Sequence, residues 1–301
     1  METLLKCPIC SSTNLESVMQ IPDHFLTNEI FSISKCLQCG FLFTNPRPLK
    51  TDIPKYYQSE DYLSHKLKKL NILSTVYYFA RNYSLSKKHS IITKQKTTGS
   101  ILDIGSGTSE FLSYMKKRGW EAVGIEPLEY PREFAKQKYS LDIYPDFDFD
   151  NKNDTTFDVI TLWHVLEHVE DLNLYMQKIS KLLKNDGLLV IALPNHESWD
   201  AKKFGTFWAA WDVPRHLYHF SQTTFHLLLK KYNFDLISTV PLKMDSYYIS
   251  FLSQKYKSGS SSFFKTIIKG FLSNRDAKKS ENNYSSLIYL SKKKKKHLNR
   301  L

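Results

Sequence analysis

The chain has 301 residues, 42% of them hydrophobic, which is enough to bury the core of one large domain and one small one. It contains no run of about 18 apolar residues and no start of signal-peptide type, so we expect a cytoplasmic protein without a transmembrane segment. The net charge of +12 does not indicate a specific nucleic-acid site, because six of the 42 basic residues lie in a solvated tail, the last ten positions.

All four cysteines lie within the first 39 residues, as two pairs with two residues between the members of each: Cys7, Cys10, Cys36 and Cys39. This spacing lets one tight turn aim both sulfurs at one ion, and two such turns complete a tetrahedral site that suits zinc. In a reducing compartment, confined pairs are more typical of metal ligands than of disulfides. We predict a structural zinc site in a zinc-ribbon-like module over residues 1–50, with an iron site of the same geometry as the alternative.

Residues 51–98 are predicted to form a helical cap or linker, because apolar residues from Leu63 to Ala80 recur at spacings of three and four. From residue 99 onward, short apolar strands alternate with helical patterns. We expect strands at 101–104, 122–125, 141–144, 157–163 and 188–193, helices at 109–118, 131–139 and 173–183, and a turn at 185–187. This alternation predicts βαβ units and a mostly parallel sheet in a domain that spans residues 99–301.

The last third of the chain is less regular. We expect a helix at 223–231, strands at 235–240 and 285–290, an irregular insert at 241–283 and a basic tail at 292–301. Within the insert, apolar residues alternate with lysines at helical spacing: Phe263, Phe264, Ile267, Ile268 and Phe271. We expect this stripe to pack onto the domain, the alternative being a membrane surface.

A glycine-rich turn follows the first strand of the large domain. Gly105 and Gly107 come directly after that strand, where the absence of a side chain lets the backbone approach a ligand. Glu126, 19 residues after Gly107, ends the second strand, where a carboxylate can accept hydrogen bonds from both hydroxyls of a ribose. The dinucleotide fingerprint has a third glycine where this chain has Glu110, so a nucleoside without phosphates is favoured over a dinucleotide. Taken singly, the glycines would be ordinary turn residues.

The chain resembles the class I S-adenosylmethionine-dependent methyltransferases in four motifs: LDIGSGTSEFL (102–112), VGIEP (123–127), FDVITLWHVLEHV (157–169) and GLLVIALPN (187–195). The resemblance implies a Rossmann-like, doubly wound α/β fold with a seven-stranded sheet, and S-adenosylmethionine as the cofactor. It implies that Asp103, Gly105 and Gly107 surround the methionine part and that Glu126 holds the ribose. It also places Asp146 and Phe147 beside the adenine, and Trp163 and His164 toward the sulfonium.

The cysteine pairs and the segment at 208–221 narrow the resemblance to bacterial small-molecule methyltransferases with an N-terminal zinc-binding segment. Sugar C-methyltransferases share this general layout. The resemblance implies methyl transfer to a small-molecule acceptor, such as a nucleotide sugar or another intermediate of surface-glycan or secondary metabolism.

Histidine is concentrated where an acceptor would bind, since six of the ten histidines lie between His164 and His226. We predict His216 as the general base, with Asp212, Arg215 and His219 in support, because histidine titrates near neutral pH. The alternative is that these histidines only hydrogen-bond a loop. Glu167 and His168, which follow the fourth strand, are interpreted as caps of the next helix.

Two other functions stay open at this point. An RNA methyltransferase would use the zinc module and the basic tail to grip nucleic acid, but no D/N-P-P-Y/F motif and no spare cysteine nucleophile is present. A non-catalytic cofactor-binding scaffold would use the zinc module to recruit a protein. The sequence does not define the oligomeric state.

Overall fold

The structure, a computed structural model, describes residues 1–57, 72–147 and 156–294. Its larger sheet has seven strands in the order β10-β11-β8-β7-β4-β5-β6, and the pairs β4–β5, β4–β7 and β5–β6 are parallel. From β4 the chain order of the strands runs outward to β5 and β6 on one side and to β7 and β8 on the other. Open α/β sheets bind ligands near such a switch point, which here lies between β4 and β7. The predicted Rossmann-like α/β fold is confirmed. The strands are β4 (Ser100–Ile104), β5 (Glu121–Ile125), β6 (Asp142–Tyr144), β7 (Phe157–Trp163), β8 (Leu183–Pro194), β10 (Phe234–Pro241) and β11 (Ser286–Lys293).

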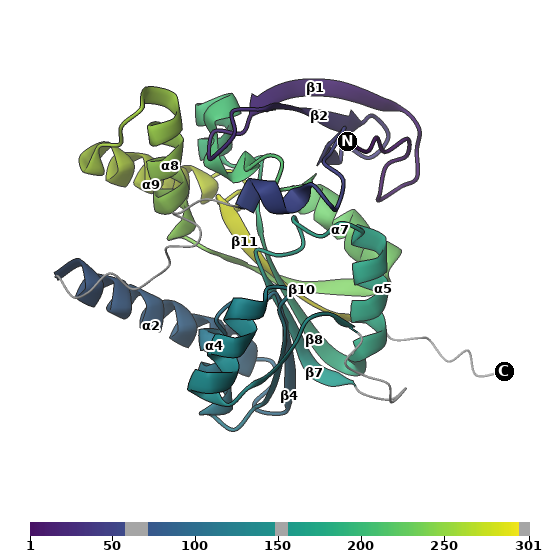
Figure 1. The fold of residues 1–301 in the computed structure, drawn as a ribbon, viewed down its shortest axis with the longest axis vertical. Helices are drawn as coiled ribbons and strands as arrows, with labels where there is room; N and C mark the ends of the chain where they lie inside the picture. Colours follow the sequence, from purple (N-terminus) through teal and green to yellow (C-terminus); the bar gives the residue numbers. More distant parts are fainter. Residues whose placement is uncertain (58–71, 148–155, 295–301) are drawn as a thin grey trace. The chain divides into compact units, whose positions relative to one another are not determined.

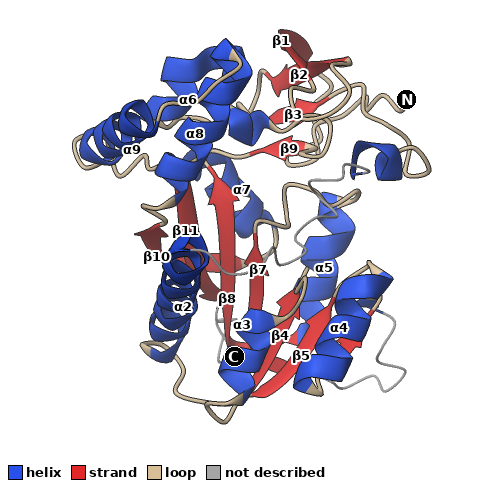
Figure 2. Cartoon of the chain, turned by 60° about the vertical axis from the view of Figure 1, so that its left-hand side comes forward, coloured by secondary structure: helices blue, strands red, loops and turns tan. Residues whose placement is uncertain are grey.

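Helices α3 (Glu110–Lys116) and α4 (Glu129–Tyr139) pack against β5 and β6 respectively (Figure 2). Gly124 on β5 makes room for this layer, because a Cβ atom there would lie 2.8 Å from Leu112 of α3 and 2.6 Å from Ile143 of β6. The glycine therefore lets α3 lie close to the sheet, and α3 begins directly after the glycine-rich turn. Helices α2 (Ile72–Thr93) and α5 (Leu172–Leu182) complete this part of the chain (Figure 1).

A second, antiparallel sheet has the order β1-β2-β3-β9, with strands β1 (Leu15–Pro22), β2 (Ile30–Cys36), β3 (Leu42–Thr44) and β9 (Tyr218–His219). Leu42 pairs with His219, and Phe43 pairs with Tyr218. The segment at residues 212–219, here called the histidine-rich segment, thus pairs with the N-terminal sheet. One aromatic core lies beside it, built from Phe31, Tyr56, Phe204, Trp208 and Trp211 among others. The remaining elements are η1 (Ile53–Tyr57), α6 (Trp199–Phe204), η3 (Gly205–Phe207), η4 (Ala209–Trp211), α7 (Gln222–Lys231), α8 (Asp245–Ser258) and α9 (Phe263–Ala277).

The contacts divide the chain into two compact units. One comprises residues 1–63, 164–173 and 192–289, and the other comprises 64–163, 174–191 and 290–301. The first unit holds the cysteines and the histidine-rich segment, and the second holds the glycine-rich turn and Glu126. Neither unit is continuous in sequence, and the domain boundaries proposed at residues 50 and 98 stay a prediction.

One expectation for local structure is supported and another is wrong. Residues 185–187 fall within the bounds of β8, but the chain turns back there as predicted, because a Cβ atom on Gly187 would lie 2.7 Å from Leu183, whereas residues four apart in an extended strand are about 13 Å apart. The insert at 241–283 is not irregular, since it contains α8 and α9, which pack against each other. A Cβ atom on Gly270 of α9 would lie 2.4 Å from the ring of Tyr247, so small residues allow the two helices this close approach.

The apolar stripe of α9 does not pack onto the domain as expected. Phe263 and Phe264 are 72% and 77% exposed, and α9 instead buries a face of small residues: Thr266, Gly270, Ser273 and Ala277. No helix in the described ranges has the length and the apolar character that crossing a membrane requires. Leu63 and residues 295–301 of the predicted tail lie outside the described residues, and β11 includes Lys292 and Lys293.

Candidate functional site

The glycine-rich turn and Glu126 meet at the carboxyl ends of β4 and β5. Gly105 and Gly107 have φ values of 71° and 51°, in the left-handed region that favours glycine. The amide of Gly105 donates to the carbonyl of Ile125 at 2.7 Å, and the amide of Gly107 donates to Oε2 of Glu126 at 2.9 Å. These bonds hold the turn against the carboxylate, so three of the predicted cofactor residues lie together.

Asp103 lies beneath this turn on β4. It is 2% exposed, and Thr161 on β7 donates a hydrogen bond of 2.5 Å to its Oδ1. Burial raises the pKa of Asp103 to about 7, with the charge of Glu126 adding to it and the Thr161 hydroxyl and Lys88 opposing it. A carboxyl group with a pKa near 7 is only partly ionised at neutral pH, and a nearby cation stabilises its ionised form. Asp103 is therefore suited to a ligand ammonium group.

Of the other predicted cofactor residues, Trp163 follows Leu162, which pairs with Ile104, so it ends β7 beside the glycine-rich turn. Trp163 at the end of β7 meets the ring of Phe111 edge-on, with centroids 5.4 Å apart. Phe147 packs edge-on against Tyr175 at 5.0 Å, while its neighbour Asp146 is exposed. Their contacts with the cofactor stay predictions.

His164 belongs to the other compact unit and lies between two carboxylates. Its Nδ1 is 3.4 Å from Oε1 of Glu167, and its Nε2 is 3.1 Å from Oδ2 of Asp245. Burial alone would lower the pKa of His164, but the two carboxylates outweigh it and raise the pKa to about 10. The predicted role of His164 toward the sulfonium stays a prediction.

Arg215 connects the histidine-rich segment to the N-terminal part of the same compact unit through hydrogen bonds and ion pairs. Its Nη2 donates to Oδ1 of Asp23 at 2.7 Å and to Oδ1 of Asp212 at 2.8 Å, and its Nη1 donates to the carbonyl of Tyr56 at 3.0 Å. Burial alone would raise the pKa of Asp23, but the hydrogen bonds and charge of Arg215 hold it below its ordinary value. Arg215 therefore positions this segment. Sequence reasoning missed Asp23, because it lies 192 positions away with no motif around it.

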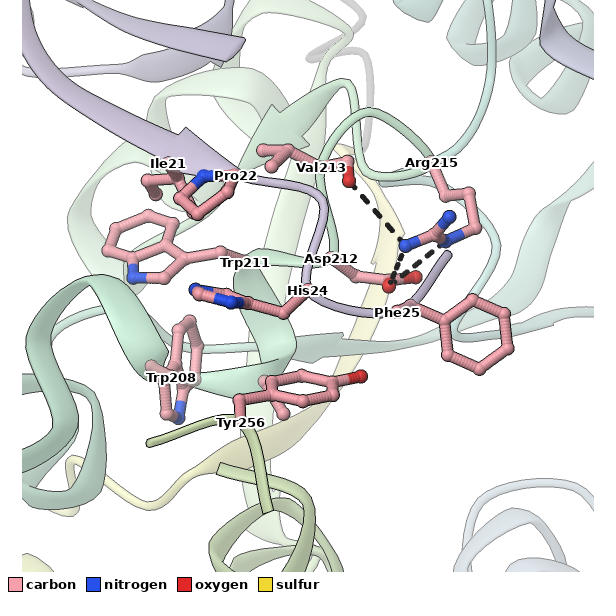
Figure 3. A pocket seen from close by; sticks show the side chains of 11 residues that line it. Ile21, Pro22, His24, Phe25, Trp208, Trp211, Asp212, Val213, Arg215 and Tyr256 are labelled. Carbon is pink, nitrogen blue, oxygen red and sulfur yellow. Dashed lines mark hydrogen bonds and ion pairs between the residues drawn. The ribbon is translucent and has the colours of Figure 1, made fainter. Parts of the chain in front are cut away.

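A small hollow lies beside this ion pair, with room for about one ordered water molecule. Figure 3 shows the rings of His24, Trp208, Trp211 and Tyr256 gathered on one side of it, with Arg215 and Asp212 on the other. The hollow thus combines aromatic surfaces with a fixed pair of charges.

The two predicted histidines of this segment, His216 and His219, donate hydrogen bonds from different ring nitrogens. Thr44 donates its hydroxyl hydrogen to the carbonyl of His216 at 2.8 Å, so His219 must donate its Nε2 hydrogen to the Thr44 oxygen at 3.1 Å. Burial lowers the pKa of His219 well below its ordinary value, which keeps the ring neutral. His216 donates from Nδ1 to the carbonyl of Ala210 at 2.9 Å, so in the neutral ring the lone pair is on Nε2. This Nε2 lies 4.0 Å from Oδ2 of Asp212.

The four cysteines converge as their spacing predicts. All are free thiols, the Sγ atoms of Cys7 and Cys39 and those of Cys10 and Cys36 are 3.5 Å apart, and all four lie within 4.8 Å of one another. A zinc tetrahedron with bonds of about 2.3 Å has sulfur–sulfur edges of about 3.8 Å, so the cluster fits such an ion. Burial would raise the pKa of Cys36, but hydrogen bonds from the amides of Cys39 and Gln38 outweigh it and lower the pKa to about 7, whereas burial raises the pKa of Cys7 to about 11.

The strand order, the glycine-rich turn and the acidic end of β5 together define the class I S-adenosylmethionine-dependent methyltransferases. The chain belongs to the methyltransferase domain family, whose model matches residues 77–239, more than half of the chain.

Curated relatives match a shorter stretch. A ubiquinone biosynthesis O-methyltransferase from Pelagibacter ubique is 33% identical over 100 residues, which cover 32% of this chain and 42% of the relative. One from Actinobacillus pleuropneumoniae is 33% identical over 120 residues, covering 34% of this chain and 50% of the relative. The chain thus spans about half the length of the curated relatives it matches.

Solved structures extend the likeness of the fold over more of the chain. The magnesium protoporphyrin IX methyltransferase from Synechocystis, with bound S-adenosylhomocysteine, has a TM-score of 0.52 at 12% identity, over 81% of this chain and 100% of that one. An O-methyltransferase of a polyketide synthase from Brevibacillus brevis has a TM-score of 0.50 at 13% identity, over 72% and 74%. At these identities the likeness shows the fold alone.

Proposed function

We propose that this methyltransferase acts on a hydroxyl group of a small-molecule acceptor. The observation that carries the proposal is the Gly105–Gly107 turn held against Glu126, followed by Glu110 where a dinucleotide site has glycine. This cradle suits a nucleoside cofactor without phosphates. An oxygen acceptor is supported by the curated relatives, which carry the name O-methyltransferase. The narrower acceptor class, a nucleotide sugar or a related intermediate, stays a prediction.

In this proposal S-adenosylmethionine supplies the electrophilic methyl group, and the chain binds the donor and removes a proton from the acceptor. Glu126 would accept hydrogen bonds from the ribose hydroxyls, and Asp103 would pair with the ammonium group of the methionine part. Removal of the acceptor proton falls to Nε2 of His216, because its Nδ1 proton is already donated to the carbonyl of Ala210. Asp212 and Arg215 position this segment, and His219 anchors it through Thr44.

Calorimetry with S-adenosylmethionine and with NAD, followed by detection of S-adenosylhomocysteine in the presence of candidate acceptors, tests this proposal. We expect micromolar binding of the methyl donor, no binding of NAD, and turnover with a hydroxyl-bearing small molecule but not with RNA. His216→Gln should lose turnover by about 100-fold or more while keeping donor affinity, and His226→Gln on α7 is the matched control. Folded protein that does not bind the donor would contradict the proposed function.

We also propose that the four cysteines hold one structural zinc ion. Cys36→Ser is expected to release the zinc and to lower the Tm by about 10 °C or more, because several kcal/mol of metal binding is coupled to folding. Zinc content by elemental analysis and the Tm by calorimetry check this. Gln38→Ser changes an exposed residue between two of the ligands and should keep one zinc per chain. A C36S protein that retains its zinc and its Tm would refute the assignment.

A further inference from the structure

A second cluster of metal-ligand side chains lies in the same compact unit as the cysteines. Glu167 and His168 follow β7 in sequence, and His216 precedes β9. One ligand atom from each of these three lies within 4.8 Å of the other two. The rings of His168 and His216 meet edge-on, with centroids 4.5 Å apart. The interpretation of Glu167 and His168 as helix caps is wrong, since α5 begins only at Leu172 and the Glu167 carboxylate accepts no hydrogen bond from a described residue.

Both histidines direct a lone pair away from their own hydrogen bonds. His168 donates from Nδ1 to the carbonyl of Arg215 at 3.0 Å, with the hydroxyl of Tyr57 3.2 Å from the same nitrogen. His216 donates from Nδ1 to the carbonyl of Ala210 at 2.9 Å. A carbonyl can only accept, so each ring carries a proton on Nδ1, and in the neutral ring the lone pair is then on Nε2. Hydrogen bonds of this kind orient the histidine ligands of metal ions in proteins.

The Glu167 carboxylate is the unusual member of the cluster. Glu167 is 1% exposed, and neither of its oxygens accepts a hydrogen bond from a described residue. The nearest charge is His164, whose Nδ1 lies 3.4 Å from Oε1, and His164 is shared with Asp245. Burying a carboxylate costs free energy unless hydrogen-bond donors or cations satisfy both of its oxygens. The Glu167 carboxylate is therefore suited to bind a further cation.

We propose that Glu167, His168 and His216 bind a divalent transition-metal ion such as Zn²⁺, Co²⁺ or Fe²⁺. Two neutral imidazoles and one carboxylate are a donor set that these ions accept. Three protein ligands leave coordination positions open, whereas the four cysteines close their own site. The chain would therefore hold two metal ions of different character, one structural and one with room for a ligand.

The use of the open positions rests on the methyl donor and the hydroxyl acceptor of the proposed function, and it replaces the role of His216 as the base. A hydroxyl oxygen of the acceptor can occupy one of them, and a bound divalent ion lowers the pKa of such a hydroxyl. The proton then leaves to solvent, the oxygen–methyl bond forms and the sulfur–methyl bond breaks. In this form His216 acts as a ligand in place of the base, so turnover would require the ion as well as the ring.

Titration with Co²⁺ of the full chain, with its cysteine site filled by Zn²⁺, tests the metal site without donor or acceptor. We expect one further equivalent of bound metal, with weak visible absorption and no sulfur-to-cobalt charge-transfer band. Glu167→Gln and His216→Gln should lose this equivalent but keep the zinc of the cysteine site. His226→Gln, on α7 and apart from the cluster, should keep both metals.

Far-ultraviolet circular dichroism and zinc content show whether each variant remains folded, and Glu167→Gln preserves the side-chain shape if His216→Gln does not fold. Wild-type protein that takes up no second equivalent overturns the metal site, as does a folded H216Q protein that still takes it up. Uptake of Co²⁺ by protein that does not bind S-adenosylmethionine supports the metal site while refuting the proposed function. The two proposals therefore fail separately.

Discussion

Replacing Glu126 by glutamine is expected to weaken the binding of S-adenosylmethionine by about 100-fold. A hydrogen bond to a charged group contributes about 1.5–3 kcal/mol, and a loss of about 2.7 kcal/mol corresponds to this factor. Glutamine keeps one carbonyl oxygen that can still accept from the amide of Gly107, so the glycine-rich turn should stay in place, while the bond from the amide of Leu128 to Oε1 is lost. Calorimetric titration of the purified variant with the donor measures the change.

Two controls separate ribose binding from support of the turn. Glu129→Gln, three residues further on and exposed, removes the same charge from the start of α4 and should leave the affinity unchanged. An analogue of S-adenosylhomocysteine without the ribose hydroxyls should bind wild-type protein weakly, and Glu126→Gln should weaken it little further. Equal losses for the analogue and the complete ligand would show that Glu126 acts only on the turn.

The proximity of the predicted cofactor residues was predictable from sequence because the residues are local. Gly105 and Gly107 follow a strand directly, and Glu126 ends the next strand, so the βαβ connection itself brings the three together. The pattern of hydrophobic residues specifies such strands, and the glycines specify the turn. No other part of the chain has to be placed for this prediction to hold.

The arrangement of the histidine-rich segment was only partly predictable, because its contacts join distant positions. Arg215 pairs with Asp23, and the two-residue strand at Tyr218–His219 pairs with β3, which a pattern of alternating hydrophobic residues cannot reveal at that length. The proton positions on His216 and His219 follow from Ala210 and Thr44, whose roles depend on the folded backbone. Sequence reasoning identified the segment correctly as polar and aromatic but could not assign its partners.

Helices α8 and α9 were missed for a different reason. The face that α9 buries is made of small residues such as Gly270 and Ser273, while its large apolar residues stay exposed. A hydrophobic pattern detects large apolar side chains, so it predicted that the phenylalanine and isoleucine face of α9 would be the buried one. The contact that decides the packing, Gly270 against Tyr247, depends on the absence of a side chain.

Replacing Arg215 by methionine is expected to lower the free energy of unfolding by about 3–5 kcal/mol, the usual cost of removing one partner of a buried ion pair. Asp23 has no exposed surface and would lose its cationic partner, keeping only hydrogen bonds from its own turn such as that from the amide of Thr27. Urea denaturation near neutral pH measures the loss. Lys231→Met, which removes an exposed cation from the end of α7, should cost far less.

The same variant should change how stability depends on pH. In wild-type protein Arg215 holds the pKa of Asp23 below its ordinary value of 3.8, so this pair stabilises the fold above that pH and the contribution is lost as the pH falls through the lower, folded pKa. Without Arg215 burial dominates and raises the pKa of Asp23, so the fold should weaken as Asp23 ionises on raising the pH. Adding Asp23→Asn to R215M should recover part of the stability at neutral pH, because no buried charge is then left unpaired. If the single and double variants are equally unstable at neutral pH, the loss comes from the packing of the Arg215 side chain instead of its charge.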